Sequence, residues 1–224
     1  SVRYYSTYLP ELYRMVLRQS AEFLKETLNE QQRKYMKRSR PKILLATNLD
    51  DAMAMYEKYK TNLLGVISDV GFCEHRGGKP DEEKLDAGIE LVKHIKADDS
   101  KMPVLLQSSQ DSICAVAEEL GVGFLRKYSK TLMIQLYEYI KEEFAFGDFI
   151  FRDADRVEYG RAANLKELEI LMREVPEDIL LANTSKNMLS KWFMARGLFT
   201  LGAKFKKVIE SQFANVTELR AYVS

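Results

Sequence analysis

The chain has little of several residue types that mark particular classes of protein. Its 224 residues include only two cysteines, five prolines, one tryptophan and two histidines. Cys73 and Cys114 lie far apart in the sequence, so we expect free thiols in a reducing compartment and not a disulfide framework. No apolar run approaches the ~20 residues that cross a bilayer. The net charge of +1 gives no bulk attraction to nucleic acid or membrane, and we expect a cytoplasmic protein.

The sequence also lacks the motifs of common enzyme classes. It has no glycine-rich loop that would cradle a phosphate, no nucleophile elbow and no metal-binding pair of histidines. His75 lies beside Cys73 and Glu74, but these are too few soft ligands to indicate a metal site. The sequence therefore does not predict a stand-alone enzyme.

What the chain does have is an alternation of strand and helix patterns over residues 42–146. Short apolar runs at 43–46, 63–69, 103–108 and 123–127 predict strands. Because these runs show no polar alternation, we expect a parallel sheet buried between helical layers. A long helix over residues 3–36 precedes it. The helices in between are expected to begin at Asp50 or Asn48, near Gly88, at Asp111 and at Ser129.

The pattern changes after residue 145. Runs at 149–152 and 156–159 flank three turn residues and predict a β-hairpin. Helices are expected at 165–174, capped by Asn164, at 186–195 and at 201–208, and a last segment is capped by Asn215. We therefore expect two domains, 1–145 and a small α+β appendage at 146–224. Trp192, Lys191 and Arg196 are candidates for a docking face, and the alternative is buried packing of Trp192 and Phe193.

Three chemically distinct side chains are expected at successive strand ends. Asp69, Ser108 and Lys127 follow the second, third and fourth predicted strands, and ligands of parallel sheets bind at the carboxyl ends of strands. A carboxylate can act as a nucleophile toward phosphorus when nearby groups neutralise the incoming charge. An acid, a hydroxyl and an amine at one edge therefore indicate acyl-phosphate chemistry.

Several short segments make residues 1–145 similar to the receiver domains of two-component systems. They are residues 46–52, 88–91, 102–104 and 121–127, which occur in the order of the family's elements. The resemblance implies a flavodoxin-like fold with helices on both faces of the sheet. It implies that Asp69 accepts a phosphoryl group from a histidine kinase or small phosphodonor, Lys127 neutralises the charge and Ser108 donates a hydrogen bond. It also implies Mg²⁺ on Asp69, the Gly71 carbonyl and an acidic pair.

The chain departs from the receiver pattern in three ways. If 43–46 is the second strand, the first strand and its acidic pair lie upstream of Ser1, and we expect four parallel strands with an open interior position. Making 43–46 the first strand would offer Asp50 and Asp51 as the pair but leave the third strand without a phosphoacceptor, so we interpret them as first-turn helix acids. The loop after Asp69 is also long, and Tyr128 stands where receivers commonly have proline.

Segments 146–149 and 192–197, with the long first helix and the loop after Asp69, suggest a narrower resemblance. They are similar to the N-terminal regulatory region of bacterial phosphoenolpyruvate-synthase-like proteins, which implies a downstream phosphotransfer domain as partner. Two functions remain open. One is a signalling receiver phosphorylated on Asp69, and the other is a degenerate receiver that acts as an unphosphorylated interaction scaffold.

Overall fold

The structure is a computed structural model that describes residues 2–25, 30, 34, 41–79, 82–184 and 187–210. The chain divides into two compact units. One comprises Ile43–Tyr139, and the other comprises Ser1–Lys42 together with Ile140–Ser224. The predicted boundary at residue 145 instead assigned the first 42 residues to the receiver-like domain.

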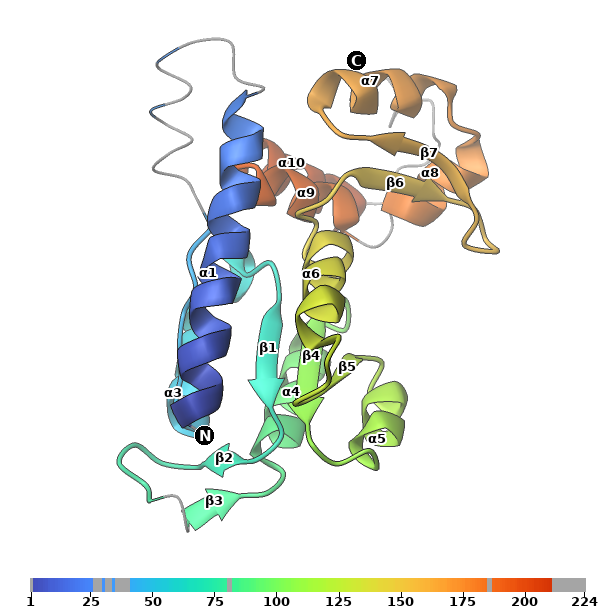
Figure 1. Ribbon diagram of the computed structural model, residues 1–224. Helices are drawn as coiled ribbons and strands as arrows, with labels where there is room; N and C mark the ends of the chain where they lie inside the picture. The colour runs from blue at the N-terminus through green and yellow to red at the C-terminus, as the bar shows by residue number, and fades with distance from the viewer. Residues whose placement is uncertain are drawn as a thin grey trace. The chain divides into compact units, whose positions relative to one another are not determined.

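A three-stranded parallel sheet forms the centre of the first unit (Figure 1). Its strands are β1 (Val66–Asp69), β4 (Val104–Ser108) and β5 (Gly123–Arg126), in the order β1-β4-β5. Every residue of β4 is buried, as expected for a central strand covered on both faces. The parallel sheet of the sequence prediction is thus confirmed over these strands.

The predicted strand at residues 43–46 is wrong, and with it the prediction of four strands. The segment forms no strand, and Leu44 and Leu45 are 44% and 48% exposed. A strand needs a neighbour to accept and donate its backbone hydrogen bonds, and an apolar sequence alone does not supply one. Within the described residues, β1 pairs only with β4, so its other side is an edge of the sheet.

Four helices connect and cover the strands of this unit: α3 (Leu49–Tyr59), α4 (Ala87–Asp98), α5 (Ile113–Glu119) and α6 (Leu132–Glu143). Asn48 caps α3, because its side chain accepts a hydrogen bond of 2.8 Å from the Asp51 N–H. The prediction that Asp111 caps α5 is wrong. Ser112 occupies that position, and the Asp111 carboxylate instead lies 3.2 Å from Arg126.

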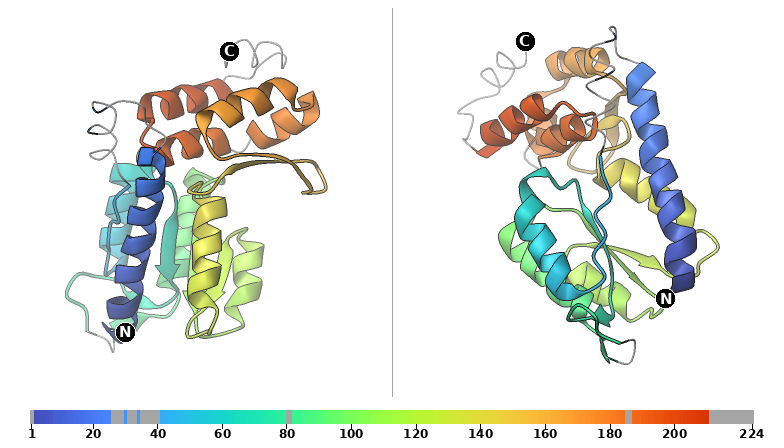
Figure 2. Two further views of the ribbon diagram at one scale, coloured as in Figure 1. Left: turned by 45° about the horizontal axis from the view of Figure 1, so that its top comes forward. Right: turned by 90° about the vertical axis from the view of Figure 1, so that its left-hand side faces the viewer.

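The sheet lies between two helical layers (Figure 2, right). α3 and α4 cover one face, where their apolar side chains pack with Val104 and Leu106 of β4 in one continuous core. α6 covers the other face, where the Tyr139 hydroxyl donates a hydrogen bond of 2.9 Å to the Val104 carbonyl. This arrangement is mixed α/β, with helices on both faces of a parallel sheet.

The second unit contains a helix, α1 (Val2–Lys25), and a C-terminal α+β region. The predicted hairpin is confirmed as β6 (Phe149–Arg152) and β7 (Glu158–Ala162). The predicted helices are confirmed as α7 (Leu165–Glu174), α9 (Met188–Ala195) and α10 (Phe199–Glu210), whereas α8 (Glu177–Thr184) was not predicted. The 26–36 part of the first helix, apart from residues 30 and 34, and the segment capped by Asn215 lie outside the described residues.

The core of the C-terminal region is built around Trp192. This side chain is 1% exposed, donates a hydrogen bond of 3.0 Å to the Gly147 carbonyl and stacks with the Arg196 guanidinium 3.5 Å from its ring centroid. Lys191 and Arg196 are also buried. The interpretation of these three residues as a docking face is therefore wrong, because their side chains are buried in the interior.

No helix in the described part of the chain has the length and apolar character needed to cross a membrane.

Candidate functional site

An ion pair joins two of the three residues that the sequence placed at strand ends. The Nζ atom of Lys127 lies 2.8 Å from Oδ2 of Asp69. Both side chains are largely withdrawn from solvent, with 17% of Lys127 and 9% of Asp69 exposed. Each charge therefore has less access to water than on an open surface.

The strands bring these residues together. Asp69 is the last residue of β1, and Lys127 directly follows β5, with β4 lying between the two strands. The Lys127 N–H donates to the Ser108 carbonyl over 2.8 Å, and the Val70 N–H donates to the Gln107 carbonyl over 3.3 Å. The backbone on both sides of the ion pair is thus tied to the central strand.

Ser108 ends this central strand and is 8% exposed. Its hydroxyl oxygen accepts a hydrogen bond of 3.1 Å from the Gln110 N–H. Because the oxygen accepts this bond, its own proton remains able to be donated to an oxyanion. The predicted acid, hydroxyl and amine therefore occupy the carboxyl ends of three neighbouring strands.

The first turn of α4 packs directly against the backbone that carries Asp69. The Gly88 N–H donates to the Val70 carbonyl over 2.8 Å, and a Cβ atom at Gly88 would lie only 2.0 Å from the Asp69 carbonyl oxygen. Only glycine permits this close approach. The sequence pointed to Gly88 as part of a family-like segment but not to this positioning contact, which depends on long-range packing.

The long loop after Asp69 contains a short antiparallel pair, β2 (Phe72–Cys73) and β3 (Glu83–Lys84), which was not predicted. Two ion pairs attach this loop to the start of α3. His75 lies 2.8 Å from Asp50, and Arg76 lies 2.9 Å from Asp51. The Asp50 N–H also donates to the Glu74 carbonyl over 3.1 Å.

These exposed pairs change the pKa values of their members in the expected directions. The hydrogen bond to Asp50 and the charge of that residue raise the pKa of His75 above its ordinary value. The hydrogen bond from Arg76, followed by that from Asn48, lowers the pKa of Asp51. Asp50 and Asp51 are thus first-turn acids of α3, as predicted, and additionally hold the loop.

A magnesium site does not follow from the described residues. They contain no group of three or more histidine, cysteine, aspartate or glutamate side chains that could hold a metal ion. One carboxylate oxygen of Asp69 already faces Lys127. Mg²⁺ binding by Asp69 and the Gly71 carbonyl, together with an acidic pair, stays a prediction.

Tyr128 follows Lys127 in an uncommon conformation. Its φ angle is 63°, in the left-handed region, and its side chain is 71% exposed. Tyr128 therefore presents an aromatic ring at the surface directly after Lys127 in the chain.

Comparison of this chain with protein-family models, curated proteins and solved structures gave no match. The interpretation of the site therefore rests on its own residues and geometry.

Proposed function

We propose that this protein is a receiver-like signalling module that accepts a phosphoryl group on Asp69. The observation that supports this most directly is the partly buried Asp69–Lys127 pair, 2.8 Å apart, beside the buried Ser108 hydroxyl at the carboxyl edge of a parallel sheet. The α/β architecture with helices on both faces is compatible with a flavodoxin-like fold, which is part of the proposal.

In the proposed reaction, a carboxylate oxygen of Asp69 attacks the phosphorus of a donor such as acetyl phosphate. The new O–P bond forms as the bond between phosphorus and the donor oxygen breaks, and acetate leaves with that electron pair. The Lys127 ammonium, already beside Asp69, neutralises a phosphoryl oxygen. The Ser108 hydroxyl donates a hydrogen bond to another.

Phosphorylation would convert the Asp69 carboxylate beside Lys127 into a larger, doubly charged acyl phosphate. The backbone next to Asp69 is hydrogen-bonded to β4 and to Gly88 of α4. We therefore expect β4 and α4 to be the first elements to move on phosphorylation. We propose a histidine kinase or small phosphodonor as the upstream partner and an attached phosphotransfer domain as the recipient of the signal. A divalent cation at this site would require carboxylates in addition to Asp69.

The test is incubation of the protein with acetyl phosphate and Mg²⁺, followed by intact-mass measurement. It is best made on the protein with any natural flanking residues, because these can complete a metal site. We expect one phosphoryl adduct that is absent in Asp69→Asn. The matched control is Asp111→Asn, which removes an exposed carboxylate from a neighbouring loop and should leave the adduct intact.

The alternative is a degenerate receiver that works as an unphosphorylated scaffold. The observation that favours it is the closed Asp69–Lys127 pair, which already satisfies the carboxylate without a phosphoryl group. Absence of any adduct in a folded protein, with partner binding unchanged in Asp69→Asn, would support this alternative and contradict the first proposal.

A further inference from the structure

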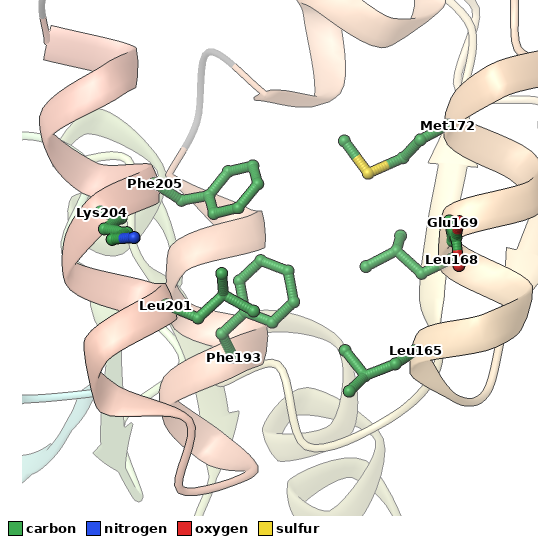
Figure 3. Close-up of a pocket in the computed structure, with 8 residues that line it drawn as sticks. All are labelled: Leu165, Leu168, Glu169, Met172, Phe193, Leu201, Lys204 and Phe205. Atoms are coloured by element: carbon green, nitrogen blue, oxygen red, sulfur yellow. The ribbon is translucent and has the colours of Figure 1, made fainter. Parts of the chain in front are cut away.

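A cavity lies within the C-terminal region and is lined by residues of α7, α9 and α10 (Figure 3). Its volume is about 320 Å³, at the lower end of the range of roughly 300–1,000 Å³ typical of small-molecule sites. Six of its lining residues are apolar: Leu165, Leu168, Met172, Phe193, Leu201 and Phe205. A site of this size and lining suits a mostly apolar ligand.

The walls of the cavity belong to well-packed elements. One wall is α7, which packs against β7, and the other is formed by α9 and α10, which pack against each other. Leu168, Phe193 and Phe205 are each at most 3% exposed and belong to the same core as Trp192. Both walls are therefore fixed by contacts outside the cavity, and the space between them does not depend on a loose core.

Two charged residues line the cavity from opposite walls, and they are not equivalent. Glu169 on α7 lies 2.6 Å from Arg173, so its charge is balanced within its own helix. Lys204 on α10 is exposed and forms no ion pair within the described residues. The remaining charge at the cavity is thus positive, and it complements an anion.

We propose that this cavity binds an amphipathic monoanion, with an apolar chain between the two walls and its carboxylate beside Lys204. A methylene group occupies about the same volume as a water molecule in the liquid, about 30 Å³, so the cavity holds roughly ten methylene-sized groups. A saturated carboxylate of about ten carbons fits this volume and charge. The proposal is independent of chemistry at Asp69.

The test is calorimetric titration of the full chain with decanoate, below the concentration at which it forms micelles. We expect saturable binding with one site. Lys204→Glu should weaken binding at least about tenfold, because it reverses the charge that meets the carboxylate. The matched control is Lys206→Glu, two residues further along α10 and outside the cavity lining, which should change the affinity less than about twofold.

Three further measurements test the roles of the cavity's shape, of the ligand's charge and of Asp69. Leu165→Trp fills the mouth of the cavity at a residue that is 45% exposed, so the fold should tolerate it while decanoate binding is lost. Decyltrimethylammonium, a cation with the same chain, should bind more weakly than decanoate. Asp69→Asn should bind decanoate normally, whatever the outcome of the phosphorylation experiment.

Several results would overturn the proposal. One is the absence of saturable decanoate binding to the folded chain. A second is equal binding of decanoate and decyltrimethylammonium, with no effect of Lys204→Glu. That result would show that the cavity does not select for a negative charge. A dimer dissociated by decanoate in sedimentation experiments would assign the cavity to a second copy. Binding only to a chain that ends at Glu210 would assign it to the chain's own C-terminal residues.

Discussion

At the scale of single residues, the candidate site depends on how Asp69 and Lys127 share a poorly solvated environment. Neither charge would be stable there alone, since removing an ion from water costs several kcal/mol. Together they satisfy each other at 2.8 Å. If Asp69 accepts a phosphoryl group as proposed, the same proximity places Lys127 to neutralise its charge.

This pairing predicts a strong interaction between the two residues. Lys127→Met removes the ammonium beside the Asp69 carboxylate and should lower the free energy of unfolding by about 3 kcal/mol at pH 7. In Asp69→Asn the same lysine substitution should cost much less. Urea unfolding of both single variants and the double variant measures this difference.

The control for the cycle is Lys130→Met, which removes an exposed lysine three residues further along the chain. It should change the free energy of unfolding by less than about 0.5 kcal/mol. Additive effects of Asp69→Asn and Lys127→Met would show that the two side chains do not interact in solution.

The His75–Asp50 pair predicts a pH dependence of the loop after Asp69. Because the folded-state pKa of His75 is raised, the pair's contribution is fully present below the unfolded value and is lost as the pH rises through the folded pKa. An NMR titration should give a His75 pKa above 6.5. Asp50→Asn should return it toward 6.5, because the main cause of the shift is removed.

His94 provides an internal reference for this titration, because it pairs with Glu57 on α3 and not with the loop. Its ring NMR signals at one fixed pH should be the same in Asp50→Asn as in the unchanged protein. A His75 pKa that does not respond to the substitution would mean that His75 and Asp50 are not paired in solution.

At the scale of secondary-structure elements, the position of Asp69 depends on the contact between α4 and the end of β1. Gly88→Ala would place a methyl group 2.0 Å from the Asp69 carbonyl oxygen, so the helix must shift away from the strand. We expect a loss of about 1–3 kcal/mol in the free energy of unfolding. The same shift should slow phosphorylation if the proposed function holds.

Gly71→Ala is the matched control for this prediction. A Cβ atom there would meet its nearest neighbour, the Leu85 Cα, at 3.6 Å, an ordinary contact. Its effect on stability in chemical denaturation should therefore be much smaller than that of Gly88→Ala. Equal effects would show that the loss comes from the backbone preference of glycine and not from the contact with Asp69.

At the scale of the whole molecule, the buried residues form separate cores in the two units. One core packs α3 and α4 on β4, and the other surrounds Trp192. Trp192 is the only tryptophan of the chain, so its fluorescence reports on the second core. Gly88→Ala should therefore shift the unfolding transition seen by circular dichroism more than the transition seen by fluorescence.

The two transitions are measured on the same samples during urea unfolding. If both shift equally, the two units unfold together.

Local patterns in the sequence were sufficient to predict most elements of the structure. Asn164 caps α7 as predicted, since its side chain accepts from the Glu167 N–H and this bond needs only neighbouring residues. The order of strands and helices also placed Asp69, Ser108 and Lys127 at one edge, because parallel strands in this topology end on the same side. The sequence by itself thus determined the candidate site residues.

Only the tertiary structure decided which segments gained hydrogen-bonded or packed partners. The 43–46 segment is apolar enough for a strand but has no ladder, whereas residues 72–73 and 83–84 pair across a loop. The Gly88 contact, the attachment of the loop to Asp50 and Asp51, and the cavity beside Lys204 join residues distant in sequence. Such contacts form only when the chain folds as a whole, because no local pattern encodes the partner.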